Sequence, residues 1–135
     1  MWDRKKRTKA QKRIDSLIGA GTVVNGNVSF AGGLRIDGKV LGNVIAVGGE
    51  PGTLVIGEHA EVTGEVRASH VVIIGKVVGP VIVDGYVELQ PKARVIGDVS
   101  YKQLEMHLGA VLRGRLNHAE PGTASVVELK RAAAD

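Results

Sequence analysis

The chain has 135 residues, which allows one domain with flanking segments. Its 19 glycines and four aromatic residues predict a thin core of small branched side chains, since a globular core normally uses larger ones. Cysteine is absent, so disulfides and thiolate metal sites are excluded and the composition fits a cytoplasmic protein. No apolar run approaches the ~20 residues of a membrane-spanning helix, and no apolar segment follows the basic N-terminus as in a secretory signal.

The positive charge is concentrated at the N-terminus. Residues 1–13 carry seven basic side chains against one acidic one, so the rest of the chain has a net charge of −2 although the whole chain is +4. We expect residues 1–17 to form a basic arm that is disordered in isolation. Basic side chains contribute about 1 kcal/mol each beside anionic lipid, and tryptophan suits the membrane interface. The residues expected to bind membrane are Met1, Trp2, Arg4, Lys5, Lys6, Arg7 and Lys9.

Two other interpretations of the arm stay open. The first is a tail that remains solvated or binds a protein partner. The second is an arm that binds nucleic acid through the same charges. Lipid is favoured over nucleic acid, because the arm has no interleaved aromatic residues for base stacking and no folded element to read a sequence.

A short motif recurs six times after the arm: an aliphatic residue, any residue, glycine, any residue and a second aliphatic residue. Val95-Ile96-Gly97-Asp98-Val99 is one copy, and the copies begin at residues 24, 40, 62, 77, 95 and 112. The gaps between them are 16, 22, 15, 18 and 17 residues, a mean of about 18. A repeat of this length indicates a solenoid whose turns stack on one another.

Each repeat also shows the alternation typical of β-strands. Leu34, Ile36 and Val40 share one side with Gly38, and polar residues lie between them. Weaker copies of the motif begin at residues 36, 73 and 83, so several short strands fall within one repeat. Three short strands in about 17 or 18 residues are typical of a β-helix coil. We favour this fold over a sandwich or barrel, because no Asn-Gly or Asp-Gly pair is regularly placed between long alternating strands.

The prediction is therefore an all-β solenoid of about six coils over residues 18–118, a rod on the order of 30 Å long. The 22-residue gap contains Gly48-Gly49-Glu50-Pro51-Gly52, a run of turn formers that predicts a loop bulging out of one coil. The pattern breaks after Leu116, and we expect residues 119–135 to form a flexible tail.

Two runs within the coils carry a family resemblance. They are Leu34-Arg35-Ile36-Asp37-Gly38-Lys39-Val40-Leu41-Gly42-Asn43-Val44 and Gly109-Ala110-Val111-Leu112-Arg113-Gly114. Together with the basic leader, the glycine-centred coils and the short tail, they resemble the bactofilins over roughly residues 18–118.

The resemblance implies a bacterial cytoskeletal protein whose core is a right-handed, three-sided parallel β-helix. It also implies end-to-end polymerisation into filaments without bound nucleotide, and association with the inner face of the cytoplasmic membrane through the N-terminal segment. Members of this family act as scaffolds for cell-wall enzymes and for proteins of cell shape and polarity. From the resemblance we expect a cytoplasmic, membrane-associated homopolymer whose partners are itself, anionic inner-membrane lipids and such client proteins.

The ends of the rod are the candidate interaction sites. A terminal coil leaves backbone groups unpaired and an apolar cross-section uncovered, and stacking on another copy would bury both. The residues expected at the N-terminal end are Ile18, Val23, Val24 and Val28. Those expected at the C-terminal end are Leu108, Val111, Leu112 and Leu116. The alternative is a monomer in which the arm and the tail fold over the ends.

An enzyme is the competing class of function. Ile56–Val62 resembles one hexapeptide of the hexapeptide-repeat acyltransferases, but the six-residue register is not sustained. A metal-dependent β-helix enzyme would draw on the four histidines His59, His70, His107 and His118, whose spacing is not that of a ligand set. No serine stands in a nucleophile elbow and neither Gly-Lys pair has the P-loop spacing. We therefore predict no catalytic, cofactor-binding or metal-binding residue.

Overall fold

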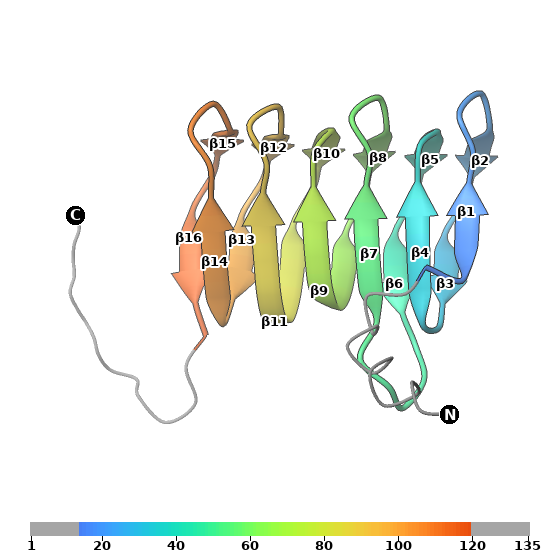
Figure 1. Ribbon diagram of the computed structural model, residues 1–135, viewed down its shortest axis with the longest axis horizontal. Helices are drawn as coiled ribbons and strands as arrows, with labels where there is room; N and C mark the ends of the chain where they lie inside the picture. The colour runs from blue at the N-terminus through green and yellow to red at the C-terminus, as the bar shows by residue number, and fades with distance from the viewer. Residues whose placement is uncertain (1–13, 120–135) are drawn as a thin grey trace, which may run out of the picture.

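The computed structural model describes residues 14–119, and every regular element in that range is a β-strand. Sixteen strands pair in parallel with strands from the preceding and following coils and form the three faces of a rod (Figure 1). The predicted all-β parallel β-helix of about six coils is thereby confirmed.

Each face contains one strand from every coil. The first face consists of β1 (Ser16–Ile18), β4 (Gly33–Ile36), β7 (Thr53–Ile56), the second half of β9 (Val66–Ile73), the second half of β11 (Val81–Leu89) and β14 (Gln103–Met106). The second face consists of β2 (Val23–Asn25), β5 (Lys39–Leu41), β8 (Glu61–Thr63), β10 (Lys76–Val78), β12 (Arg94–Ile96) and β15 (Val111–Arg113). The third face consists of β3 (Val28–Phe30), β6 (Val44–Ala46), the first halves of β9 and β11, β13 (Val99–Tyr101) and β16 (Leu116–His118).

The register of the second face coincides with the spacing of the sequence motif. Val24 pairs with Val40, Val40 with Val62, and Val62 with Val77. The same column continues through Val95 to Leu112. The unequal gaps in the sequence are therefore absorbed by the loops, while the first residue of every motif copy stacks directly on the one before it.

The inward-pointing residues of the three faces form one narrow apolar core. Valines predominate on the second and third faces, and larger aliphatic side chains such as Ile36, Leu54 and Ile73 are fully buried on the first. Phe30 is the single aromatic residue among the buried ones. Branched aliphatic side chains suit this interior because they pack well on a pleated surface and span little distance.

The motif glycines stand at the corner between the second and third faces, where successive coils approach closely. Gly97 has a φ of 146°, and a Cβ atom added to it would lie 2.4 Å from the carbonyl oxygen of Gly79 in the coil below. A corner between the first and second faces repeats the arrangement, since a Cβ on Gly75 would lie 2.2 Å from the carbonyl oxygen of Gly57. Glycine is required at these corners because a side chain would collide with the backbone of the preceding coil.

The residue after the motif glycine has a structural role in several coils. The side-chain Oδ1 of Asn27 accepts a hydrogen bond from the backbone N–H of Asn43 at 2.9 Å, and Asn43 Oδ1 accepts one from the N–H of Glu65 at 2.9 Å. Asp98 repeats this contact with the N–H of Arg115 at 3.0 Å. These side chains therefore tie neighbouring coils together at the corner, beyond the solvating role expected for an outward polar residue.

The long coil contains the predicted loop. Its extra residues lie between β6 and β7, where Figure 1 shows the chain extending from the lower edge of the rod. The chain re-enters the ladder at Thr53, whose N–H donates to the carbonyl of Gly32 at 2.9 Å. The loop thus adds length to one coil without shifting the register of β7 on β4.

The strands run from Ser16 to His118, so the first strand begins two residues before the boundary expected between arm and solenoid. The expectations about residues 1–13, including the proposed membrane-binding side chains, lie outside the described residues, as do those about residues 120–135. Between residues 14 and 119, the structure contains no helix long and apolar enough to cross a membrane.

Candidate functional site: the ends of the rod

The two ends of the rod differ from its middle in backbone pairing. Within residues 14–119, strands β1, β2 and β3 each pair with one strand of the second coil only. At the other end, β14, β15 and β16 each pair with one strand of the fifth coil. Each terminal coil thus presents three strand edges whose backbone groups have no partner from a further described coil.

The C-terminal coil exposes residues that would be buried anywhere else in the rod. Leu116 lies in register with Val99, which is fully buried, yet Leu116 is 42% exposed. Leu112 lies in register with the buried Val95 and packs against the core from one side only. As far as residues 14–119 are concerned, the apolar cross-section of the rod is therefore open at this end.

The inward residues of the N-terminal coil are related to the core in the same way. Ile18, Val24 and Val28 lie in register with Ile36, Val40 and Val44, all of which are fully buried. Ile18, Val24 and Val28 themselves are only partly buried and pack against the core from one side. The inward side chains of this coil are thus placed to continue the core into another apolar surface.

Three of the eight predicted end residues occupy other positions. Val23 and Val111 are outward residues of the second face, because they share a register column with Lys39 and Arg94. Leu108 lies in the corner loop between β14 and β15 and is 95% exposed. The structure brings the other five together as inward side chains of the terminal coils: Ile18, Val24, Val28, Leu112 and Leu116.

Two residues of the C-terminal end were not among those expected from the sequence. Leu104 and Met106 are the inward residues of β14, in register with the buried Val87 and Leu89, and Met106 is 42% exposed. The signal that would have found them is the alternation in Gln103-Leu104-Glu105-Met106. They complete the apolar cross-section on the first face, beside Leu112 and Leu116 on the other two.

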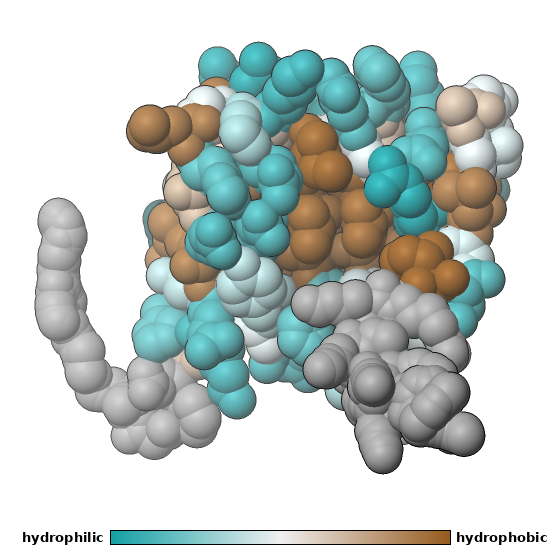
Figure 2. Space-filling model, viewed as in Figure 1, coloured by the Kyte–Doolittle hydropathy of each residue, from teal (hydrophilic) through white to brown (hydrophobic). Residues whose placement is uncertain are grey.

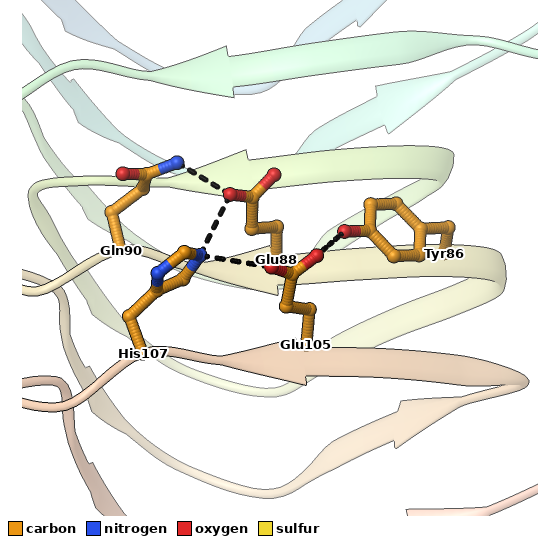
Figure 3. Close-up of polar contacts among 5 residues, drawn as sticks. All are labelled: Tyr86, Glu88, Gln90, Glu105 and His107. Carbon is orange, nitrogen blue, oxygen red and sulfur yellow. Dashed lines mark hydrogen bonds and ion pairs between the residues drawn. The ribbon is translucent and has the colours of Figure 1, made fainter.

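A polar network lies on the first face near the same end (Figure 3). His107 Nε2 is 2.9 Å from Glu88 Oε2 and 3.3 Å from Glu105 Oε2, and Gln90 donates to Glu88 at 2.6 Å. Glu88 and Glu105 are direct cross-strand partners, so their like charges would repel without these contacts. The Tyr86 hydroxyl donates to the Glu105 carboxylate, and this bond, with burial and the nearby Glu88 charge, raises the pKa of Tyr86 to about 12.

Three members of this network have the chemistry of metal ligands. Glu88, Glu105 and His107 place one ligand atom each within 4.8 Å of one another, and among residues 14–119 no other group of His, Cys, Asp or Glu side chains does so. The hydrogen bonds already account for their close approach, and exposed carboxylates commonly lie together without an ion. The other three histidines, His59, His70 and His118, are not part of the group. The absence of a metal-binding residue stays a prediction.

Comparison with known proteins decides the family. Residues 16–117 match the family model Bactofilin, described as polymer-forming cytoskeletal. The chain belongs to the bactofilin family. The match begins and ends within a residue of the first and last strands of the rod, so the family signature of this bactofilin is the β-helix itself.

Characterised relatives extend over the same region. Bactofilin BacO of Myxococcus xanthus (strain DK1622) is 26% identical over 103 residues, 76% of this chain and 79% of the relative. The solid-state NMR structure of the cytoskeletal bactofilin BacA has a TM-score of 0.67 at 35% identity, and the match covers 78% of this bactofilin and 97% of BacA. A cryo-EM reconstruction of Thermus thermophilus bactofilin double helical filaments also has a TM-score of 0.67, at 32% identity, covering 76% and 99% of the two chains.

Proposed function

We propose that this bactofilin is a cytoskeletal scaffold whose subunits stack end to end into filaments without a nucleotide. The observation that carries the proposal is made on residues 14–119: in both terminal coils, apolar inward side chains occur together with strand edges that no further described coil pairs. Stacking a second copy on either end would bury the apolar side chains and supply backbone partners at the same time. The family description, polymer-forming cytoskeletal, supports the same conclusion, and it is that of a structural protein rather than an enzyme.

Electron microscopy of the purified full chain without nucleotide tests this proposal. Filaments are expected, with an axial repeat set by the six-coil rod. Monomeric particles at high protein concentration would contradict end-to-end stacking. The acyltransferase alternative makes a different prediction, a stable trimer of fixed mass, which light scattering distinguishes from a polymer of variable length.

The finer part of the proposal concerns location. We propose that the filament lies in the cytoplasm at the inner face of the membrane, docked on anionic lipid by the basic arm, and localises cell-wall enzymes or proteins of cell shape and polarity. The support is the composition of the arm, in which seven basic residues and Trp2 fall within residues 1–13. Long-lived docking would follow from many arms acting together along one filament.

Flotation with liposomes tests the role of the arm. The full chain is compared with a variant in which Arg4, Lys5, Lys6 and Arg7 are replaced by glutamine. We expect the unmodified chain to float with anionic vesicles in a salt-sensitive manner and not with neutral ones. Because the filament itself can sediment, vesicles are recovered by flotation. Equal flotation of both proteins would contradict docking through the arm.

A further inference from the structure

The outward side chains of the first face form a column that changes character along the rod. In register order the column contains Leu17, Arg35, Val55, Val72, Glu88 and Glu105, one residue from each coil. We call these six residues the outer row. A basic residue thus precedes the apolar pair in the middle of the rod, and an acidic residue follows it.

The apolar middle of the outer row is a contiguous patch. Val55 and Val72 are direct cross-strand partners, and Ile74 lies two residues beyond Val72 on the same side. Figure 2 shows this brown patch at the centre of the face toward the viewer, between hydrophilic groups over the coils on either side. An apolar patch framed by polar groups on a flat sheet face is typical of a surface that contacts another protein.

The other two faces are less suited to such a contact, as the columns of their outward residues show. On the second face, Val78 and Ile96 are also direct cross-strand partners, but the like-charged Lys76 and Arg94 are partners in the column beside them. The adjacent column of that face carries the charged residues Lys39, Glu61, Lys76 and Arg94. On the third face, Arg67 separates Ile45 from Ile82 in the corresponding column.

Two charges of the outer row flank the patch at equal distances, while the row ends in Leu17 on one side and Glu105 on the other. Arg35 lies one coil before Val55, and Glu88 lies one coil after Val72. If a second copy faces the first with its rod axis reversed, Val55 meets Val72 and Arg35 meets Glu88, twice by symmetry. A parallel arrangement would instead oppose arginine to arginine and glutamate to glutamate.

The side chains themselves are suited to that contact. The Nε atom of Arg35 donates to the Asp37 carboxylate at 3.0 Å, and the guanidinium has four further N–H donors that can reach an incoming carboxylate. Glu88 is held by Gln90 and His107 at the edge of the patch, so its position is defined before a partner arrives. Charged groups at the edge of an apolar contact fix orientation more than they add affinity.

We infer that the first face pairs two rods side by side in opposite directions, with a second copy of this chain as the occupant. The inference rests on the proposed filament, because a patch of a few aliphatic residues is too small for a stable isolated dimer and must act repeatedly along two filaments. The relative from Thermus thermophilus is described as forming double helical filaments, which is a property of that protein. The charge pattern of this chain assigns the face and the direction of the pairing.

A substitution at the centre of the patch distinguishes side-by-side pairing of filaments from end-to-end polymerisation. In electron micrographs the unmodified chain should form paired filaments, and Val72→Lys should form single filaments of normal length. Ile82→Lys is the matched control, since Ile82 is an outward aliphatic residue of the same coil on the third face. Val72→Lys filaments that stay paired would overturn the inference. If the unmodified chain formed no filaments at all, the proposed function would be refuted instead.

Charge-reversal variants test whether the two rods pair in opposite directions. Arg35→Glu opposes glutamate to Glu88 and Glu88→Arg opposes arginine to Arg35, so each variant alone should form unpaired filaments. Mixing the two separately assembled filaments should restore pairs, because in the antiparallel arrangement both contacts then join an arginine to a glutamate. Unpaired filaments in the mixture, with circular dichroism showing both variants folded, would overturn the antiparallel arrangement.

Discussion

Val111 and Leu112 are neighbours in the last coil and lie on opposite sides of the second face. Val111 shares its column with Arg94 on the outside of the rod, whereas Leu112 stacks on the buried Val95. Of these two adjacent residues, one therefore belongs to the outer surface of the rod and the other to the apolar cross-section at its end.

This relationship gives a matched test of end-to-end stacking. Leu112→Arg places a charge in the apolar cross-section, where a stacked copy would bury it without a partner, so filaments should be lost while the subunit stays folded. Val111→Arg adds the same charge at the position that Arg94 occupies one coil earlier, and it should polymerise normally. Sedimentation and electron microscopy compare the two. Normal filaments from Leu112→Arg would show that the C-terminal coil is not an assembly surface.

The stacked glycines predict a large and local effect on stability. In Gly97→Ala the new Cβ would lie 2.4 Å from the Gly79 carbonyl oxygen, and the residue would keep a φ of 146° that alanine rarely adopts. We expect a loss of about 1–3 kcal/mol in the free energy of unfolding from the backbone conformation, with the collision adding to it. Thermal and urea unfolding measure the change.

Gly49→Ala is the control for this substitution. Gly49 lies in the loop of the long coil, and a Cβ added there meets no atom within 4 Å. Its unfolding midpoint should stay close to that of the unmodified chain. Equal losses for the two variants would mean that alanine is poorly tolerated for a reason other than the close approach of the coils.

The coil register was predictable because one steric requirement repeats in every coil. From the second coil on, each motif glycine marks a corner where its backbone lies against that of the preceding coil, so the spacing of the glycines in the sequence follows the stacking of the coils. The alternation of apolar and polar residues then separates inside from outside within a strand. Val23 and Val111 resemble core residues of the rod ends because they are apolar, although the same alternation places them with Lys39 and Arg94 on the outside.

Contacts between coils could not be predicted in the same way. The Asn43 bond to Glu65 joins residues 22 positions apart, and the Glu88 and His107 contact joins residues 19 positions apart. Polar residues in outward positions are expected from solvation alone, so neither pair leaves a distinct signal in the sequence. The outer row of the first face likewise becomes visible only when the register between coils of unequal length is known.

The asparagine contacts at the corner predict a moderate loss of stability. In Asn43→Ala the backbone N–H of Glu65 loses its side-chain acceptor, so the free energy of unfolding should fall by about 1 kcal/mol. Asn43→Asp is the control, because aspartate retains an acceptor oxygen and Asp98 makes the equivalent bond to the N–H of Arg115. Urea unfolding should place Asn43→Asp nearer to the unmodified chain. Equal stability of all three proteins would show that water replaces the side chain at no cost.

The raised pKa of Tyr86 predicts that the stability of the fold depends on pH in the alkaline range. The Tyr86 hydroxyl donates to Glu105, and its pKa is raised to about 12, above the value of about 10 expected in the unfolded chain. The folded state therefore binds this proton more tightly. The resulting stabilisation is fully present below about pH 10 and is lost as the pH rises through about 12. Tyr86→Phe should remove that part of the pH dependence.

Tyrosinate absorbance measures this ionisation directly. The chain has two tyrosines, so the difference between the titrations of the unmodified protein and of Tyr86→Phe isolates Tyr86. The difference should titrate near pH 12, and Glu105→Gln should shift it toward lower pH because the charged acceptor is removed. A difference curve already centred near 10 in the unmodified protein would mean that the Tyr86 and Glu105 bond does not persist in solution.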